Sequence, residues 1–246
     1  MQPRFVGRLS LADAVTVSNA ALGFLAVVAA PTNAELAARL VLLAAVADGL
    51  DGVLARHVGS SAAGPYLDSL ADVASFAVAP AALVVAVVRE AWGLDGLRPA
   101  VAVLGAALFV AMAVVRLGLY TAHDAKEDTT EGVPTTLASV VLGSVVLVGV
   151  TGPVALVVLV YVLAGLMVST ITYPDLLARD ALIMGVVHSL AVLVPDVLGR
   201  AFPYALLTLA LAYLVLGPHF YWRSTGEGST DEESVDEGTA ERAKSG

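Results

Sequence analysis

Four aspartates stand in two pairs within the segment DGLDGVLARHVGSSAAGPYLDSLAD, residues 48–72. Asp48 and Asp51 are three residues apart and Asp68 and Asp72 are four apart, so on helices each pair would share one face. Four carboxylates brought together repel one another unless cations neutralise them, and oxygen ligands suit the hard ions Mg²⁺, Mn²⁺ and Ca²⁺. The spacing therefore predicts a site for two divalent cations, whose charges would balance the four carboxylates.

Small and basic residues beside the aspartates indicate what the ions would hold. Gly52 and Ala55 continue the face of the first pair at helical spacing and leave room for a flat ligand. Arg56 adds a cation that can pair with a phosphate, and Gly64 lets the connecting backbone approach a ligand closely. Because Mg²⁺ shares its coordination shell with substrate phosphates, the segment indicates a phosphate-bearing ligand.

The elements that carry these residues are apolar enough to cross a membrane. The chain has 246 residues, of which 58% are hydrophobic, and its mean hydropathy is +0.85. Since about 17 to 25 apolar residues span a bilayer, we expect about eight spans in an all-α integral membrane protein. The apolar runs cover residues 11–30, 34–56, 66–91, 98–122, 133–151, 153–172, 180–198 and 201–222.

Composition and charge set further limits. The net charge is −9, and residues 223–246 are polar and acidic, so we expect a disordered tail after a membrane domain at 1–222. This balance argues against nucleic acid as a partner, because nucleic acid calls for a basic surface. Two lysines against eleven arginines favour an archaeal cell with a salt-rich cytoplasm, although compositional bias would explain them almost as well. Cysteine is absent, which excludes thiolate metal sites and cysteine nucleophiles.

Basic residues predict the orientation in the membrane. With eight spans, both termini share one side with Arg4, Arg8, Arg56, Arg116, Lys126, Arg179 and Arg223, while Arg39, Arg89, Arg98 and Arg200 lie on the other. Because lysine and arginine are enriched in cytoplasmic loops, we expect the termini and the aspartates at the cytoplasmic face of the cell membrane.

A cation transporter is an alternative class of protein, since its intramembrane carboxylates also bind ions. Transporter ion sites lie near the bilayer midplane. Asp48 precedes the interfacial Arg56 by eight residues, which is about 12 Å along a helix. This depth favours an enzyme that faces the cytoplasm.

The aspartate segment resembles the signature of the CDP-alcohol phosphatidyltransferases, D-x2-D-G-x2-A-R-x7/8-G-x3-D-x3-D. The eight fixed positions are Asp48, Asp51, Gly52, Ala55, Arg56, Gly64, Asp68 and Asp72. Within that superfamily, LDSLADVASFAVAPA at 67–81 is most similar to the phosphatidylserine synthase branch. The pieces TVSNAALGF (16–24), EGVPTT (131–136) and STITYPDL (169–176) agree with that branch.

The resemblance implies a six-helix core over about residues 10–172, two appended helices and a homodimer. It implies transfer of a phosphatidyl or archaetidyl group from a CDP-activated lipid to an alcohol, with release of CMP. L-serine is the favoured acceptor, and glycerol phosphate and inositol phosphate are alternatives. In a halophilic archaeon the product would be archaetidylserine.

The resemblance also implies roles for the site residues. Asp48, Asp51 and Asp68 would hold two Mg²⁺ or Mn²⁺ ions, and Asp72 would share an ion and take the proton from the alcohol. The CDP-lipid would be bound by Gly52, Ala55, Arg56 and Gly64.

The acceptor is predicted from residues outside the segment. Arg116 could meet the carboxylate of serine, or it could extend to lipid phosphate as a structural residue. Thr135, Thr136, Ser169 and Tyr173 are further candidate contacts for the acceptor or for a lipid head group.

Overall fold

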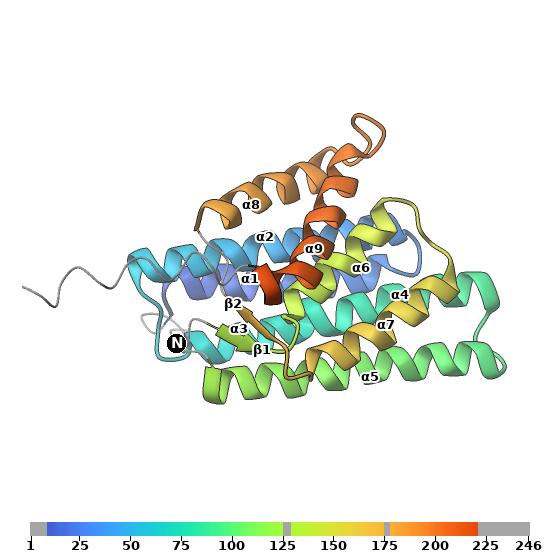
Figure 1. Ribbon diagram of the computed structural model, residues 1–246, viewed down its shortest axis with the longest axis horizontal. Coiled ribbons are helices and arrows are strands. Elements are labelled where there is room, and N and C mark those ends of the chain that lie inside the picture. Colours follow the sequence, from blue (N-terminus) through green and yellow to red (C-terminus); the bar gives the residue numbers. More distant parts are fainter. Residues whose placement is uncertain (1–8, 125–128, 175–177, 221–246) are drawn as a thin grey trace, which may run out of the picture.

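The computed structural model describes residues 9–124, 129–174 and 178–220, and these are almost entirely helical (Figure 1). Each predicted apolar run corresponds to one helical segment. The segments are α1 (Leu11–Ala29), α2 (Ala34–Val58), α3 (Gly64–Asp72) continued by η1 (Val73–Val78) and α4 (Ala79–Trp92), α5 (Leu97–Leu119) continued by η2 (Tyr120–Asp124), α6 (Thr135–Leu147), α7 (Pro153–Met167), α8 (Ala178–Leu193) and α9 (Ala201–Phe220). The predicted acidic tail, 223–246, lies outside the described residues, as do Arg4, Arg8, Lys126 and Arg223.

The helices have the lengths of an all-α membrane protein, which confirms the predicted fold class. Four segments are long and apolar enough to cross a membrane, namely Leu11–Ala29, Gly64–Trp92, Leu97–His123 and Ala201–His219. The helix α2 has 25 residues but also carries the first aspartate pair. With 13 and 15 residues, α6 and α7 are apolar but only about 20 and 22 Å long. They are therefore shorter than a hydrocarbon core of about 30 Å.

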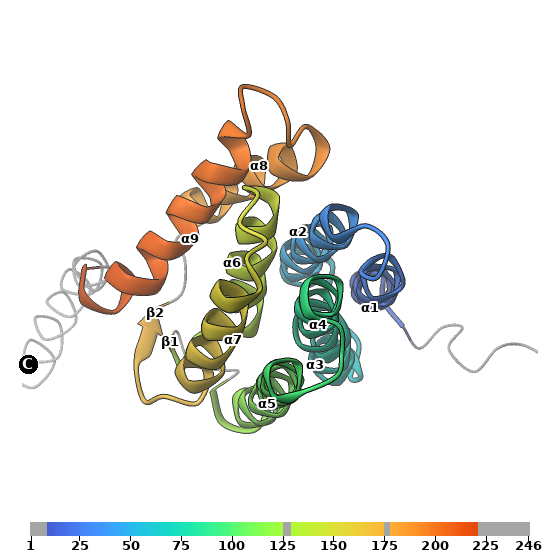
Figure 2. The ribbon, with the colours of Figure 1, turned by 90° about the vertical axis from the view of Figure 1, so that its right-hand side faces the viewer.

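The helices form two groups that meet where α9 packs on α6 and α8 packs on α2. Viewed nearly end-on, α1, α2, α4 and α5 lie on one side and α8 and α9 on the other, with α6 and α7 between them (Figure 2). The helix α1 packs chiefly against α2, and α6 packs against both α2 and α9. One large hydrophobic core joins the groups, with Leu42, Leu83, Phe109, Leu142 and Leu163 fully buried in it.

A short antiparallel sheet replaces the predicted end of the sixth apolar run. The sequence predicts helix to residue 172, but α7 ends at Met167, and β2 (Thr172–Pro174) pairs with β1 (Thr129–Glu131). Gly132, directly after β1, permits the chain to pass close to the end of α7. Its φ is +76°, and a Cβ there would lie 2.1 Å from the carbonyl oxygen of Met167. The chain thus folds back across the ends of α5 and α7.

Hydrogen bonds attach the two C-terminal helices at both ends. Near the sheet, the Tyr173 hydroxyl donates to the Leu214 carbonyl at 3.0 Å, and the Tyr213 hydroxyl donates to the Pro174 carbonyl at 2.6 Å. At the opposite end, Arg200 donates to the Leu147 carbonyl at 2.7 Å. The helices α8 and α9 are therefore packed onto α2 and α6 as part of the same bundle.

A π-helical turn follows the second aspartate pair directly. Val73–Val78 forms η1 inside the continuous helix 64–92, and Pro80 follows it. Proline has no N–H, so it leaves the carbonyl four residues earlier, that of Phe76, without its helical donor. The Ser139 hydroxyl on α6 donates to this carbonyl at 2.6 Å. Serine on a neighbouring helix thus satisfies the backbone group that proline frees, as the membrane interior requires.

We expect Ser139→Ala to destabilise the protein by about 1 kcal/mol, because the buried Phe76 carbonyl would lose its donor. Reversible unfolding in mixed micelles measures the change. Ser189→Ala is the matched control, since the Ser189 hydroxyl donates only within its own helix, to the Gly185 carbonyl. Equal stabilities of the two variants would contradict the assignment.

Candidate active site

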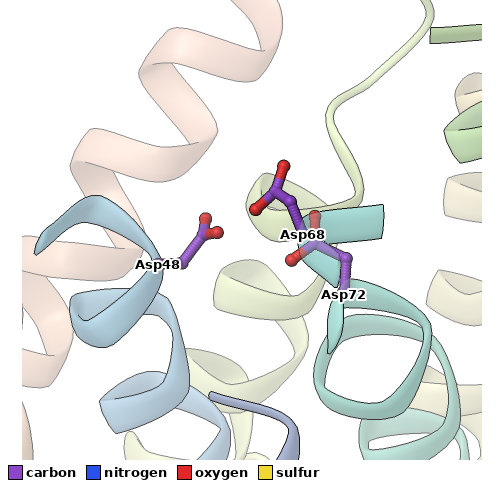
Figure 3. A group of neighbouring side chains, drawn as sticks. All are labelled: Asp48, Asp68 and Asp72. Atoms are coloured by element: carbon purple, nitrogen blue, oxygen red, sulfur yellow. The ribbon is translucent and has the colours of Figure 1, made fainter. Parts of the chain in front are cut away.

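Three of the four aspartates converge between α2 and α3. The carboxylates of Asp48, Asp68 and Asp72 each offer an oxygen, and these oxygens lie within 4.8 Å of one another. Figure 3 shows the three side chains pointing toward a common space, Asp48 from α2 and the other two from α3. Asp72 is buried, and Asp48 and Asp68 are half-buried. The fold thus brings the second predicted pair together with Asp48, the first member of the other pair.

Asp51 belongs to a different part of the same site. Its carboxylate is buried and accepts a hydrogen bond of 2.6 Å from the Thr16 hydroxyl on α1. It lines a cavity of about 240 Å³ that also reaches Asp68. The wall is formed by Ala12, Asp13, Thr16, Asp51, Gly52, Ala55, Ser60, Gly64, Pro65, Asp68, Ser69, Tyr120 and Thr121. Asp68 therefore belongs both to the carboxylate cluster and to the wall of the adjacent cavity, while Asp51 lines the cavity only.

The residues predicted to bind the donor divide into three that line this cavity and one that does not. Gly52 and Ala55 line it, and a Cβ on Gly52 would meet no atom within 4 Å, so the wall is open there. Gly64 is a close-packed position, because a Cβ would lie 3.0 Å from the Ser60 Cβ and 3.1 Å from Asp13 Oδ1. Arg56 is exposed at the end of α2 and is not part of the cavity wall. Its contact with phosphate stays a prediction.

Polar side chains from three other helices approach the carboxylate cluster. Asn19 on α1 donates through Nδ2 to Asp72 Oδ1 at 3.5 Å, and Thr136 on α6 donates to Asp48 Oδ2 at 3.4 Å. The positive charge of Arg116, on α5, attracts the carboxylate of Asp72. These contacts fix the carboxylates from several sides.

Arg116 is held inside the protein. Its side chain is 8% exposed, donates to the Thr130 hydroxyl on β1 at 3.0 Å, and stacks over the Tyr120 ring with 5.1 Å from Cζ to the ring centroid. These contacts hold the guanidinium within the fold, and its extension to lipid phosphate stays a prediction. Its contact with an acceptor stays a prediction.

Further acceptor candidates are Thr135 at the start of α6, Ser169 between α7 and β2, and Tyr173 in β2. The Thr135 hydroxyl is fully buried and has no hydrogen-bond partner among the described residues. Ser169 donates to the Leu166 carbonyl at 2.8 Å, and the buried Tyr173 donates to the Leu214 carbonyl. The hydroxyls of Ser169 and Tyr173 are thus used in holding the fold, and their acceptor roles stay predictions.

Sequence reasoning assigned no role to Thr16 or Asn19. These residues are three apart in an otherwise apolar run, which is the same one-turn spacing that identified the aspartates. Thr136, a candidate hydroxyl contact from the sequence, directly follows Thr135 at the start of α6 and donates to Asp48.

The carboxylate oxygens of the cluster are suitable ligands for divalent cations. The carboxylates of Asp48, Asp68 and Asp72 repel one another in a partly buried space. Neither salt bridge within the described residues includes an aspartate of the site, since both join Arg200 to other acidic residues. Oxygen-only ligands at these separations suit Mg²⁺ or Mn²⁺.

Comparison with known proteins decides the family. Residues 9–171 match the sequence profile of the CDP-alcohol phosphatidyltransferases, which is more than half of the chain. The chain belongs to the CDP-alcohol phosphatidyltransferase family. The matched region ends just before α8, so the two C-terminal helices lie beyond it.

One relative in the comparison carries the name of a specific enzyme. Over 170 residues the chain is 29% identical to an archaetidylserine synthase of Methanothermobacter thermautotrophicus, strain Delta H. The alignment covers 68% of this chain and 70% of that protein. This phosphatidyltransferase is thus a multi-pass membrane enzyme of a divalent-metal-dependent family that uses a CDP-activated lipid and an alcohol.

We expect Mg²⁺ or Mn²⁺ to stabilise the purified protein in detergent, by about 2.7 kcal/mol at 100 times the dissociation constant. Asp68→Asn removes one repelling charge, so in chelator it should raise stability by an amount on the order of 1 kcal/mol. The same variant should lose most of the gain from metal. Melting in chelator and in Mn²⁺ measures both effects.

The control for this prediction is Asp95→Asn, which changes an exposed aspartate in the segment between α4 and α5. It should respond to metal as the unaltered protein does. A full metal response in Asp68→Asn would show that the ion binds elsewhere.

Proposed function

We propose that this phosphatidyltransferase transfers a phosphatidyl or archaetidyl group from a CDP-activated lipid to L-serine and releases CMP. The observation that carries the proposal is the cavity of about 240 Å³ that opens beside the converging carboxylates. A diphosphate held at the carboxylates would place an attached nucleoside within reach of that cavity. Support for serine comes from the archaetidylserine synthase relative.

The donor side of the proposal uses the cavity wall. Gly52 and Ala55 leave a flat surface on α2 against which the cytidine would lie. Gly64 lets the start of α3 pack close to Asp13 and Ser60 and so closes the far wall. Arg56, exposed at the end of α2, would pair with a phosphate from the solvent side.

The acceptor side is proposed to lie near Asp72. The charge of Arg116 acts on Asp72, so a serine whose carboxylate contacts Arg116 would have its hydroxyl close to Asp72. The buried Thr135 hydroxyl, which has no partner within the described chain, is available for a further contact. Arg116 is positively charged and Asp72 is negatively charged. An amino acid suits this pair, since it carries a negative carboxylate and a positive ammonium.

The chemistry follows from these positions. The serine hydroxyl oxygen attacks the phosphorus that bears the lipid, and the bond from that phosphorus to the oxygen bridging the diphosphate breaks. CMP leaves with the bonding electrons, and Asp72 takes the proton of the hydroxyl. Asp48, Asp51, Asp68 and Asp72 would hold two divalent cations, which supply positive charge that stabilises the displaced phosphate oxygens.

The orientation and assembly remain proposals. We propose that the termini and the aspartate site face the cytoplasm, because lysine and arginine are more frequent on that side of the predicted spans. A homodimer is also proposed, because glycine and alanine are frequent in the helices and permit close packing between chains.

We expect purified protein to release CMP from a CDP-activated lipid only when Mg²⁺ or Mn²⁺ and a suitable alcohol are both present. Serine, glycerol phosphate, inositol phosphate and ethanolamine are supplied in parallel with CDP-archaeol and CDP-diacylglycerol, and CMP and lipid products are quantified. Serine should give the highest kcat/KM. Faster turnover of a phosphorylated alcohol would overturn the acceptor, and release that persists in chelator would overturn the metal requirement.

Asp72→Asn should reduce kcat by at least about 10²-fold, because the amide cannot accept the proton of the hydroxyl. Binding of the CDP-lipid should be retained, since Asp51 and the cavity wall are unchanged. Single-turnover kinetics at saturating Mn²⁺, with equilibrium binding of a CDP-lipid, separates the two effects. Turnover equal to that of the Asp95→Asn control would remove Asp72 from this role.

A further inference from the structure

Helix α1 approaches the second aspartate pair unusually closely. A Cβ added to Gly23 would lie 2.7 Å from the Cα of Ser75 in η1, so glycine is what permits the two backbones to come together. The Ser75 hydroxyl donates to the backbone carbonyl of Asn19 at 2.8 Å. Short side chains on α1 can therefore reach carboxylates on α2 and α3.

Two of these short side chains end on the site aspartates. The Thr16 hydroxyl lies 2.6 Å from Asp51 Oδ2 and 3.1 Å from the Ala12 carbonyl, so its single hydrogen is directed to the nearer carboxylate. Asn19 is fully buried and donates to Asp72 Oδ1 at 3.5 Å. Its Oδ1 has no hydrogen-bond partner within the described chain, which leaves Asp72 as the contact of its carboxamide.

The two contacts separate the aspartates into different tasks. Thr16 turns Asp51 toward the cavity, whereas Asn19 keeps Asp72 in the cluster with Asp48 and Asp68. Asp51 and Asp72 would otherwise repel each other and the remaining carboxylates. The backbone N–H of Gly52 on α2 also donates to Asp51. The side-chain donors Thr16 and Asn19, however, both come from α1. The distinction therefore depends largely on α1.

We propose that Thr16 and Asn19 are positioning residues, through which α1 orients Asp51 for the donor and Asp72 for the acceptor hydroxyl. This inference rests on the proposed function for its kinetic consequences. Its consequence for metal affinity rests only on the carboxylate geometry, because groups that orient metal-binding side chains affect the affinity whatever reaction follows.

The first test is metal binding without turnover. Purified protein is titrated with Mn²⁺ and the free ion is measured by electron paramagnetic resonance. We expect Thr16→Val and Asn19→Ala each to weaken Mn²⁺ binding by roughly 10-fold or more. Thr16→Ser, which keeps the hydroxyl, should bind Mn²⁺ within about twofold of the unaltered protein.

The matched control is Ser18→Ala on the same helix. Ser18 is exposed, and its hydroxyl donates to the Ala14 carbonyl of its own helix at 2.9 Å. This variant should bind Mn²⁺ normally. If Asn19→Ala does not fold, the comparison of Thr16→Val with Thr16→Ser still decides the matter, and equal Mn²⁺ affinity in those two would overturn the proposal.

The second test separates positioning from a general loosening of α1. At saturating Mn²⁺, Thr16→Val should raise KM for the CDP-lipid by roughly 10-fold with kcat nearly unchanged, whereas Asn19→Ala should lower kcat by roughly 10-fold or more. Equal changes of both parameters in both variants would overturn the division of tasks. If Mn²⁺ binding changes as expected but the unaltered protein releases no CMP, the proposed function fails and the positioning of the carboxylates stands.

Discussion

The mutual repulsion of four carboxylates inside an apolar bundle is the constraint on which the rest of the structure depends. An isolated carboxylate at a membrane-buried position costs about 2.5 to 3.5 kcal/mol, and these four also raise one another's energy. Hydroxyl and amide donors from α1 and α6 offset part of that energy, and the positive charge of Arg116 offsets a further part. The remaining negative charge makes the site dependent on cations.

This dependence couples the stability of the bundle to the binding of metal and of the donor. A diphosphate is itself anionic, so it binds favourably only where cations already outweigh the carboxylates. In the proposed function, the cavity beside Asp51 and Asp68 would then add contact with the uncharged part of the ligand. The bound cations would thus decide whether the CDP-activated lipid can bind. The small residues Gly52 and Ala55 would decide which shape of nucleoside fits the cavity.

The aspartate cluster and the helices could be predicted from the sequence because both follow from periodicity. One-turn spacing fixes which side chains share a helix face, and the length of an apolar run fixes whether it can span a bilayer. The sheet could not be predicted, since strands of three residues are too short to show alternation.

The separate environment of Asp51 could not be predicted either, because it depends on tertiary packing. It requires the distance between α1 and η1, which Gly23 and Ser75 set, and Thr16 gave no indication of its partner. For the same reason the sequence left Arg116 with two alternatives and gave no sign of its contacts with Thr130 and Tyr120.

The π-helical turn η1 also restricts how this protein can diverge in sequence. Each residue of an α-helix advances by about 100° around the axis, so removal of one residue from the α-helical parts of 64–92 would rotate α4 by about that angle relative to Asp68 and Asp72. That rotation would carry Leu83, Val84 and Val88 out of the core or the aspartates out of the site. It applies where the helix is α-helical, whereas a π-helical turn already holds an extra residue. Loss of one residue from η1 would return the turn to α-helix and keep both faces in place, so a change of length in this helix should be tolerated best within residues 73–78.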